Sequence, residues 1–342
     1  MHLKRYVYWS IETLCGVTKP IAFSLFLCAI QMCKRIDMKV NFVVPVYNGG
    51  SIWEQCAAAL HACLVAEKLS PQQVLVIDSS SRDNSLDVAA HYGFRCHSIT
   101  SAEFNHGGTR NLGVEMSGGD VVVFLTQDAI PQPYFIREIV SAFTDERVAV
   151  AYGRQLPHDD ANPLACHARR FNYRSRSQIM GMMNKAQHGI KTVFSSNSFA
   201  AYRVKVFHEL GGFPSNTILS EDMYLAAQAV LAGYRVAYVA QAAVKHSHNY
   251  TPIEEFKRYF DIGVFHCDEK WIREAFGGAG GEGMRFIFSE LRYLMKKNHY
   301  LWIPRACVHN ALKIAGYKLG QHYQKIPHGL ISKLSMHKRF WQ

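Results

Sequence analysis

The chain has 342 residues, of which 49% are hydrophobic and 19% are charged. This composition supplies enough apolar side chains for a large core and excludes a mainly disordered chain. The formal net charge is +11, and nearly all of the excess lies in residues 1–37 and 251–342, while residues 38–250 are close to neutral. Basic ends around a neutral centre indicate a domain held near an anionic surface, for which anionic lipid and nucleic acid are both candidates.

Residues 1–37 contain an apolar run at 20–33, which is shorter than the roughly 20 residues that a membrane-spanning helix needs. Two interpretations stay open. Either Met38 is the natural start and the preceding residues are an upstream extension, or the run forms an interfacial anchor helix. The strand that we predict directly after Met38 supports the first interpretation.

The next part of the chain alternates between short β-branched runs and helix-length stretches. We predict strands at 40–48, 74–81, 94–100 and 120–129, and helices at 51–68, 84–91 and 109–116. This alternation implies an α/β fold with a mainly parallel sheet, in which ligands bind beyond the carboxyl ends of the strands. Polar residues do gather at these ends, namely Asn48, residues 78–81, Gln127 and Asp128.

The second half of the chain begins with a predicted strand at 148–155. The polar and basic stretch 157–192 is irregular, and we interpret it as a mobile loop for an acceptor substrate. Strand and helix resume at 193–213, followed by a helix at 221–232 and a strand at 234–248. Residues 251–342 are predicted to be helical, basic and aromatic, with a glycine-rich break at 276–283.

The first two strand ends have the composition of a nucleotide site. Asp78 ends a buried strand, where its carboxylate can accept a hydrogen bond from the imide N–H of a uracil or thymine ring. Pro45, Tyr47 and Asn48 could form the other wall of the base pocket. The loop 78–85, which includes Ser80, offers hydroxyls suited to a ribose. A plain Asx turn explains the same loop, so both readings stay open.

The segment 104–111, FNHGGTRN, is more specific. Gly107 and the glycine after it allow backbone to approach a ligand closely, and the guanidinium of Arg110 suits a phosphate or carboxylate. Asn111 is expected to open the next helix. A turn with a helix cap explains the glycines but leaves the polar run of Asn105, His106, Arg110 and Asn111 unexplained.

Acidic and imidazole side chains further along suggest acid–base and metal chemistry. Ser220 is predicted to cap a helix with Glu221 and Asp222 in its first turn, and one of these acids could serve as a general base. His246 and His248 are two residues apart, so both face one side of a strand. They could bind a metal or form a surface pair. Asp128, at its strand tip, could hold Mg²⁺ or Mn²⁺ on a diphosphate.

Taken together, these segments resemble a family 2 glycosyltransferase of the GT-A fold. The ordered set is VVPVYNGG, VIDSSSRDNS, FNHGGTRNLG, FLTQDAIP, GGFP, SEDMYLAAQAVLAGYRVAYV and KHSHNY. It is most similar to the bacterial rhamnosyltransferase branch and covers residues 39–250. The resemblance implies a GT-A-type nucleotide-sugar-binding domain with a mainly parallel central sheet at 38–250 and a basic helical C-terminal region at 251–342.

The resemblance also assigns roles to individual residues. The expected general base is Asp222, assisted by Glu221, and the metal motif falls on residues 126–128, where Thr126 replaces the first of two aspartates. Asp128 would then bind Mg²⁺ or Mn²⁺ with one histidine of the 246–248 pair, His246 more than His248. The expected nucleotide-sugar-binding residues are Pro45, Tyr47, Asn48, Asp78, Ser80, Asn105, His106, Gly107, Arg110, Asn111 and Gln127.

The resemblance further implies an inverting enzyme that adds one sugar at a time, because no Gln-x-x-Arg-Trp motif follows residue 250. Its donor would be dTDP-L-rhamnose, and its acceptor a lipid-diphosphate-linked glycan of bacterial O-antigen or capsule synthesis. The Asp222 carboxylate would take the acceptor proton, while metal and Arg110 offset charge on the departing diphosphate.

The basic, aromatic segment 293–323 predicts peripheral attachment to the cytoplasmic face of the inner membrane. An ordinary amphipathic helix with a solvated basic face is the alternative. Two other functions also stay open. One is a nucleic-acid-binding protein that uses the basic C-terminal region, although no nucleic-acid-binding module is recognisable and no nucleic-acid partner is expected. The other is a nucleotide-sugar-binding pseudoenzyme, suggested by Thr126.

Overall fold

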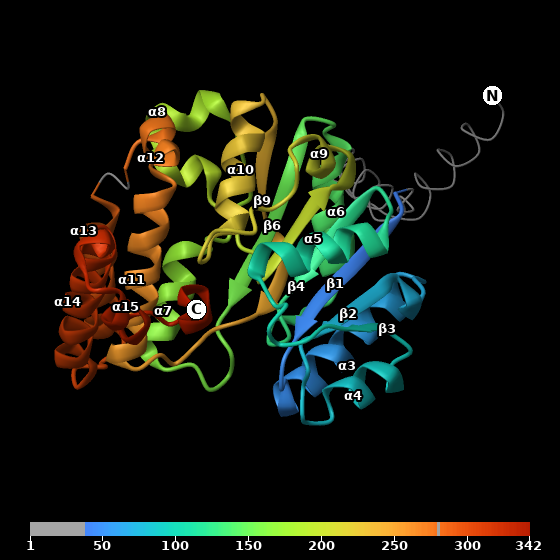
Figure 1. The fold of residues 1–342 in the computed structure, drawn as a ribbon, viewed down its shortest axis with the longest axis horizontal. Coiled ribbons are helices and arrows are strands. Elements are labelled where there is room, and N and C mark those ends of the chain that lie inside the picture. Colours follow the sequence, from blue (N-terminus) through green and yellow to red (C-terminus); the bar gives the residue numbers. More distant parts are fainter. Residues whose placement is uncertain (1–37, 279–280) are drawn as a thin grey trace, which may run out of the picture. The chain divides into compact units, whose positions relative to one another are not determined.

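The structure, a computed structural model, describes residues 38–278 and 281–342, so the interpretations of residues 1–37 lie outside the described residues. Within the described part, nine strands form one sheet in the order β3-β2-β1-β4-β8-β6-β9-β5, and β7 pairs with β9 (Figure 1). The strands are β1 Val40–Val46, β2 Val74–Asp78, β3 Arg95–Ser98, β4 Val121–Leu125, β5 Ile130–Pro131, β6 Val148–Leu156, β7 Gln178–Met180, β8 Phe199–Arg203 and β9 Arg235–Lys245.

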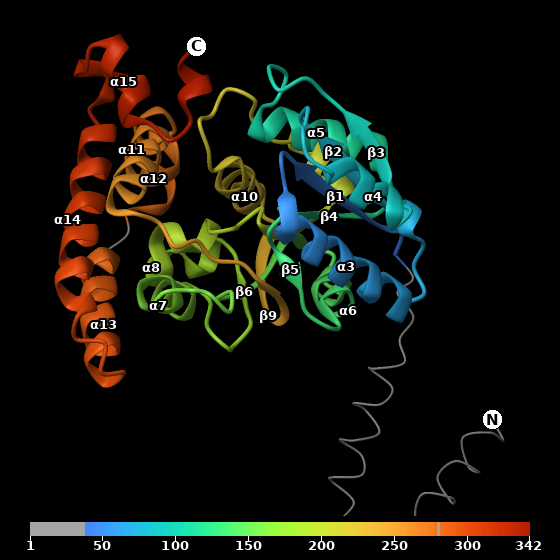
Figure 2. The same cartoon turned by 90° about the horizontal axis from the view of Figure 1, so that it is seen from below.

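The first four strands in sequence form the parallel half of the sheet, as predicted. β1 pairs with β2 and β4, and β2 pairs with β3, all in parallel. β2 and β4 are buried along their whole length, because helices cover both faces, and this explains their continuous apolar sequence. Figure 2 shows α5 on one face of these strands and α3 with α6 on the other. The helices are α3 Gly50–Ala66, α4 Ser85–His91, α5 His106–Ser117 and α6 Phe135–Ser141.

The other half of the sheet is mixed. β8 runs antiparallel to both of its neighbours, β4 and β6, whereas β6 and β9 are parallel. Because β8 is reversed, its amino end lies at the edge where β1, β2 and β4 have their carboxyl ends, and Phe199 pairs with Leu125 there. The residues that precede β8 are therefore delivered to the same edge as the polar residues that follow β2 and β4. The helices of this half include α9 Val204–Glu209 and α10 Glu221–Leu231.

The segment 157–192 is more regular than the sequence analysis predicted. It contains α7 Pro163–Asn172, β7 and α8 Lys185–His188. The side chain of Asn162 caps α7, because its Oδ1 accepts hydrogen bonds from the N–H groups of Leu164 (3.0 Å) and Ala165 (2.9 Å), and Pro163 occupies the first helical position. Asn-Pro is a recognised helix start, so the interpretation of the whole segment as irregular was wrong.

The C-terminal region is helical, as predicted, with a break between α12 and α13. Its helices are α11 Pro252–Asp268, α12 Lys270–Phe276, α13 Glu282–Lys296, α14 Trp302–Gly320 and α15 His328–Leu334. α11 and α14 approach closely at Gly316 and Gly320, where an added Cβ would lie 2.3 Å and 2.0 Å from the carbonyl oxygens of Phe256 and Phe260. Figures 1 and 2 show α13 and α14 side by side on the flank opposite to β2 and β3.

Candidate active site

The three aspartates at the centre of the sequence-based prediction lie at one edge of the sheet. Asp78 ends β2 and Asp128 follows β4, and these strands are linked in parallel through β1. Asp222 belongs to the first turn of α10, and its Oδ2 accepts a hydrogen bond from the backbone N–H of Asn197 (2.8 Å) just before β8. The reversed β8 therefore brings Asp222 to the edge that holds Asp78 and Asp128.

Asp78 is buried and only half satisfied. Its Oδ2 accepts from the N–H of Ser81 (3.0 Å), whereas its Oδ1 has no hydrogen-bond partner within the described residues. A buried acceptor without a partner costs about 1–3 kcal/mol, so a ligand N–H at Oδ1 would recover that energy. This arrangement fits the expected contact with a uracil or thymine imide.

The loops after β1 and β2 are tied together by hydrogen bonds between backbone N–H groups and side-chain oxygens. The N–H of Asn48 donates to Ser81 Oγ (2.9 Å), and Asn48 Oδ1 accepts from the N–H of Arg82 (2.8 Å), with Asn48 in the left-handed region (φ 46°). The Ser80 hydroxyl donates a hydrogen bond to the carbonyl of Ile99 (3.0 Å), so its proton already has an acceptor within the protein. Asn48 and Ser80 thus shape the loops.

Three further predicted residues lie beside these loops. The Tyr47 side chain is exposed and can stack on a base, while Pro45 is half-buried within β1. Gln127 spans the gap between the ends of β1 and β4: its Oε1 accepts from the N–H of Tyr47 (2.7 Å) and its Nε2 donates to the Tyr47 carbonyl (3.3 Å). The Gln127 amide thereby braces the backbone of Tyr47, and its expected contact with the nucleotide sugar stays a prediction.

The segment 105–111 joins α5 to the loop before α10. Asn105, not Asn111, caps α5, and its Oδ1 accepts from Gly108 N–H (2.8 Å). Asn111 lies inside the helix and exchanges two hydrogen bonds with the backbone of Phe213 (2.8 and 2.9 Å). A Cβ on Gly107 would lie 2.0 Å from the Pro214 carbonyl oxygen. The close backbone approach at Gly107 is therefore to the 213–215 loop.

Arg110 is paired with Glu221 in the interior. Its Nη1 lies 3.1 Å from Glu221 Oε1 and donates to the carbonyl of His106 (2.9 Å), and both charged side chains are at most 7% exposed. The Nδ2 of Asn197 also donates to Glu221 Oε1 (2.9 Å). Burial opposes the charge of Glu221, but Arg110, then His106 and Asn197, outweigh it and hold its pKa below the ordinary value. The structure thus corrects the expectation that Arg110 faces a phosphate.

Asp222 differs from Glu221 in exposure and in charge environment. It is partly exposed whereas Glu221 is buried, and its Oδ1 accepts from the N–H of Met223 (2.7 Å). Burial and then the neighbouring Glu221 charge raise the pKa of Asp222 above its ordinary value. A carboxylate with a raised pKa that a substrate can reach has the properties of a general base.

Ser220 does not act as the predicted side-chain cap. It stands before α10 in the left-handed region (φ 61°), and its side chain makes no capping hydrogen bond. Asp222 satisfies the N–H of Met223 in its place.

Asp128, His246 and His248 form a compact cluster. His246 Nε2 and His248 Nε2 lie 3.4 and 3.7 Å from Asp128 Oδ2, and one possible ligand atom from each residue lies within 4.8 Å of the others. Burial and then the neighbouring His246 lower the pKa of His248 to about 4, and burial also lowers the pKa of His246. Both rings are therefore neutral near pH 7, as metal ligation requires.

Gln155 orients the buried histidine of this cluster. Its Oε1 lies 2.9 Å from His246 Nδ1 and also accepts from Nη1 of Arg169. A hydrogen bond at Nδ1 leaves the Nε2 lone pair free towards Asp128, which is the arrangement seen around metal-binding histidines. Gln155 was not among the predicted site residues, although it ends a predicted strand in the same way as Asp78 and Asp128.

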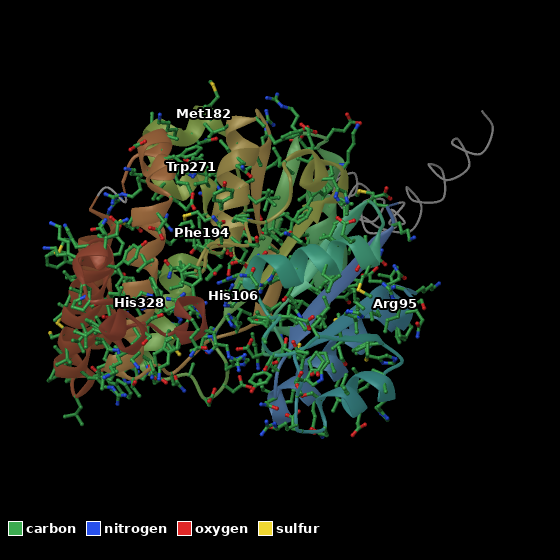
Figure 3. The ribbon with its side chains drawn as sticks, in the orientation of Figure 1. Arg95, His106, Met182, Phe194, Trp271 and His328 are labelled. Carbon is green, nitrogen blue, oxygen red and sulfur yellow. The ribbon has the colours of Figure 1, made fainter. Side chains whose placement is uncertain are left out.

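The C-terminal segment also reaches the site. His337 Nδ1 lies 3.4 Å from His106 Nε2, and its backbone N–H donates to Oδ2 of the buried Asp261 (3.2 Å). Figure 3 shows His106 between the parallel strands and the C-terminal helices. No local pattern around His337 indicated this contact, which joins residues 231 positions apart.

Comparison with known proteins agrees with this geometry. The family description that matches residues 41–211 is glycosyl transferase family 2. The O-antigen chain rhamnosyltransferase RfbN of Salmonella typhimurium is 50% identical over 307 residues, which cover 89% of this chain and 96% of that protein. The O-antigen chain rhamnosyltransferase WbaN of Salmonella anatum is 50% identical over 304 residues, or 88% of this chain and 95% of that protein.

A solved structure shows the same fold at low sequence identity. The mannosyltransferase PcManGT from Pyrobaculum calidifontis, in complex with GDP-Man and Mn²⁺, superimposes with a TM-score of 0.58 at 14% identity and covers 89% of this chain and 94% of that chain. The resemblance drawn from the sequence, including its rhamnosyltransferase branch, is confirmed. The chain belongs to glycosyltransferase family 2 and has the GT-A fold.

Proposed function

We propose that this chain transfers L-rhamnose from dTDP-L-rhamnose, with inversion, to a lipid-linked glycan in O-antigen or capsule synthesis. The two relatives that are 50% identical over most of their length are both named O-antigen chain rhamnosyltransferases, and this supports the sugar and the process. The reaction type rests on one observation: Asp222, which is partly exposed, and the Asp128–His246–His248 cluster lie at the same sheet edge.

Asp222 is the proposed base. It would accept the proton of the acceptor hydroxyl as that oxygen attacks the anomeric carbon of the donor sugar, while the bond to the diphosphate breaks. Two backbone N–H groups, of Asn197 and Met223, fix its carboxylate. Glu221 contributes by holding Asn197 and by keeping a negative charge next to Asp222 that raises its pKa.

Asp128, His246 and His248 are the proposed metal ligands. One carboxylate oxygen and two imidazole nitrogens suit Mn²⁺ better than Mg²⁺, because Mg²⁺ prefers an all-oxygen shell. The compact arrangement of the three side chains and the Gln155 contact to His246 support the fit. A bound divalent cation would offset negative charge on the leaving diphosphate. Asp78, with its unpartnered Oδ1, and the exposed Tyr47 are the proposed contacts to the thymine.

A thermal-shift panel and a transfer assay test this function together. We expect dTDP-L-rhamnose with Mn²⁺ to raise the melting temperature more than the matching UDP, GDP or CDP sugars, because a ligand that binds only the folded state stabilises it. Radiolabelled rhamnose should then pass to a lipid-linked acceptor, and EDTA should abolish the transfer. His246→Ala should lose the Mn²⁺-dependent part of the shift, whereas His61→Ala, at a half-buried histidine outside the cluster, should keep it. If another nucleotide sugar raised the melting temperature most, dTDP-L-rhamnose would be rejected as the donor.

The proposed place of action is the cytoplasmic face of the inner membrane, with the lipid-linked acceptor in that surface. Among the helices of residues 38–278 and 281–342, none is long and apolar enough to span a bilayer. α13, α14 and the residue before α14 nevertheless expose apolar side chains. We define the apolar stripe as Met284, Phe288, Met295, Leu301, Val308 and Leu319.

Charge complements this apolar stripe. Lys296, Lys297, Arg305 and Lys318 are exposed on the same two helices, while the opposite side of α14 packs on α11 through Gly316 and its neighbours. Apolar side chains flanked by lysine and arginine are typical of helices that lie on anionic lipid, where each basic residue contributes about 1 kcal/mol.

We therefore expect the protein to bind vesicles that contain phosphatidylglycerol at low salt and to dissociate as salt rises. The double variant Leu301→Asp/Val308→Asp should weaken binding by at least about tenfold, since it removes two apolar contacts and adds two negative charges. Val65→Asp replaces an exposed valine on α3, 59% exposed against 51% for Val308, and should leave binding unchanged. Sedimentation with vesicles measures the binding of both variants. Equal binding to vesicles with and without phosphatidylglycerol would contradict the prediction.

A further inference from the structure

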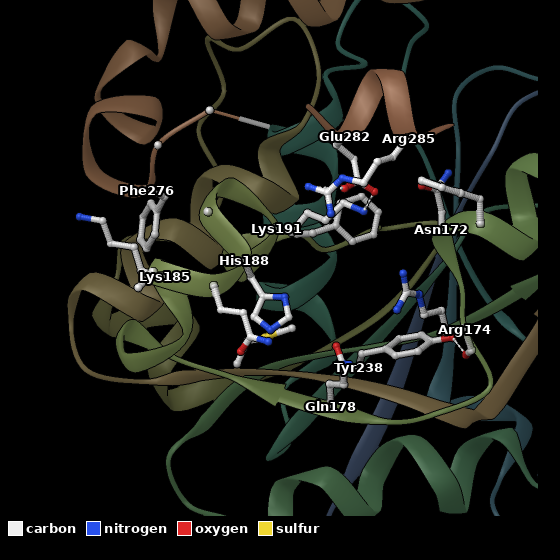
Figure 4. Close-up of a pocket in the computed structure, with 18 of the residues that line it drawn as sticks. Asn172, Arg174, Gln178, Lys185, His188, Lys191, Tyr238, Phe276, Glu282 and Arg285 are labelled. Atoms are coloured by element: carbon white, nitrogen blue, oxygen red, sulfur yellow. Dashed lines mark hydrogen bonds and ion pairs between the residues drawn. The ribbon is translucent and has the colours of Figure 1, made fainter. Parts of the chain in front are cut away.

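A cavity of about 640 Å³ lies away from the residues that we assign to donor and metal. It is bounded by the end of α7, by β7 and α8, by the end of α12 with the two glycines that follow it, and by the start of α13 (Figure 4). Its volume falls within the range of about 300–1,000 Å³ that is typical of small-molecule sites. Neither Asp78, Asp128 nor Asp222 lines it, so a ligand there would be distinct from the donor nucleotide.

The charge of this cavity is strongly positive. Arg174, Arg176 and Lys185 line it, and within the described residues no carboxylate lies at ion-pair distance from any of the three. The acid in the lining, Glu282, already forms an ion pair with Lys191. Guanidinium groups bind phosphate oxygens with two parallel hydrogen bonds, so the cavity suits a phosphate or diphosphate.

Aromatic side chains form the other part of the lining. Tyr152 contacts Phe194 and Tyr238 with ring centroids 5.4 and 5.1 Å apart, and Phe171 and Phe276 lie elsewhere around the cavity. Aromatic rings offer rigid apolar faces together with polar edges, and such faces pack against the C–H groups of a pyranose. Cations and rings in one cavity therefore match a sugar that carries a phosphate or diphosphate.

The aromatic wall adjoins the proposed base. Phe194 is three residues from Asn197, whose N–H holds Asp222, and three residues span at most about 11 Å. The ring of Tyr173 joins the two regions: it contacts Phe194 and Tyr238 at 6.2 and 6.4 Å, and the Asp222 charge is near enough to raise the pKa of Tyr173, after the larger effect of burial. The aromatic part of the cavity thus lies near the reaction edge.

We propose that this cavity binds the acceptor as a glycosyl diphosphate, with Arg174, Arg176 and Lys185 on the diphosphate and the aromatic wall on the sugar. This assignment rests on the proposed transferase function, because only a second substrate needs a second anion site beside the base. The acceptor is then recognised by the group that joins its sugar to the lipid, which explains why one cavity holds both cations and rings.

Calorimetric titration with inorganic diphosphate in EDTA tests the cavity without any enzyme activity. Arg174→Gln/Arg176→Gln is expected to weaken diphosphate binding by at least about tenfold, since two charge-assisted contacts are lost. The matched control, Lys68→Gln/Lys205→Gln, removes two exposed charges outside the cavity and should stay within about twofold of the parent protein, as expected for exposed charges. Equal binding by parent and cavity variant, or none by the parent protein, would overturn the proposal.

Two further experiments test whether the cavity is distinct from the donor site and whether the proposed function itself is correct. Excess dTDP should leave diphosphate binding intact, and displacement by dTDP would overturn the proposal by making the cavity part of the donor site. In the transfer assay the cavity variant should raise the acceptor KM at least tenfold with the donor KM unchanged. A parent protein without rhamnosyl transfer would reject the function, while the titration would still decide whether the cavity binds diphosphate.

Discussion

Asp222→Asn is expected to lower kcat by at least about a hundredfold, within the 10²–10⁴-fold range of a general base. The amide cannot accept the acceptor proton, whereas its carbonyl oxygen can still take one of the two backbone hydrogen bonds that fix the carboxylate. Donor binding should survive, because Asp78, Tyr47 and the Asp128 cluster are unchanged. Rapid-quench measurement of rhamnosyl transfer, with dTDP binding measured separately, gives both quantities.

Asp160→Asn is the matched control for this variant. Asp160 is an exposed acid whose carbonyl, rather than its carboxylate, accepts a hydrogen bond from Asn249, so the same chemical change there should leave kcat within about twofold of the parent enzyme, as expected for a group with no part in proton transfer. A kcat near the parent value in Asp222→Asn would remove Asp222 from the mechanism.

The pH profile provides an independent readout of the same base. Only the ionised form of Asp222 can accept a proton, so kcat/KM should fall as pH decreases through its pKa. Because burial and Glu221 raise that pKa, the acidic limb should lie above the range of an ordinary aspartate. Asp222→Asn should abolish this limb, whereas Asp160→Asn should retain it.

The parts of the site that the sequence predicted are those with local signals. Asp78 and Asp128 each follow a short, fully buried strand, and the periodicity of the chain places both at the carboxyl edge. Adjacent acids at a helix start likewise marked Glu221 and Asp222. Parallel pairing makes such local signals converge, because every parallel strand delivers its carboxyl end to one edge.

The residues whose observed contacts differ from the predicted ones have partners that are distant in the sequence. Asn111 and Arg110 were read as ligand contacts, yet their partners, Phe213 and Glu221, lie more than 100 positions away. A polar motif of this kind looks the same whether it binds a ligand or another loop. The antiparallel direction of β8 could not be predicted either, because a short apolar run indicates a strand but not whether it pairs in parallel or antiparallel. This reversal is what brings Asn197 to Asp222.

The Arg110–Glu221 pair should dominate the stability of the site. Arg110→Met leaves Glu221 buried without its cation, and breaking a buried pair in this way costs about 3–5 kcal/mol of unfolding free energy. The control is Arg235→Met, because Arg235 and Asp145 form an ion pair at a similar distance, 3.0 Å, but with side chains 37% and 29% exposed. Such partly exposed pairs contribute about 0–1 kcal/mol. Urea unfolding at pH 7 compares the two variants.

Low pH and a second substitution should both reduce the loss of unfolding free energy in Arg110→Met. Glu221 has a lowered pKa in the folded protein, so its ionised form adds stability above the pKa of the unfolded chain, and this contribution is lost as pH falls through the folded-state pKa. In the variant, burial without a cation favours the protonated acid, so the loss against the parent protein should shrink below about pH 5. Arg110→Met/Glu221→Gln should recover at least half of the loss at pH 7, since no buried charge is left and Gln can still accept from Asn197. Equal stability of Arg110→Met and Arg235→Met at every pH would contradict the prediction, because the buried pair would then contribute no more than the partly exposed one.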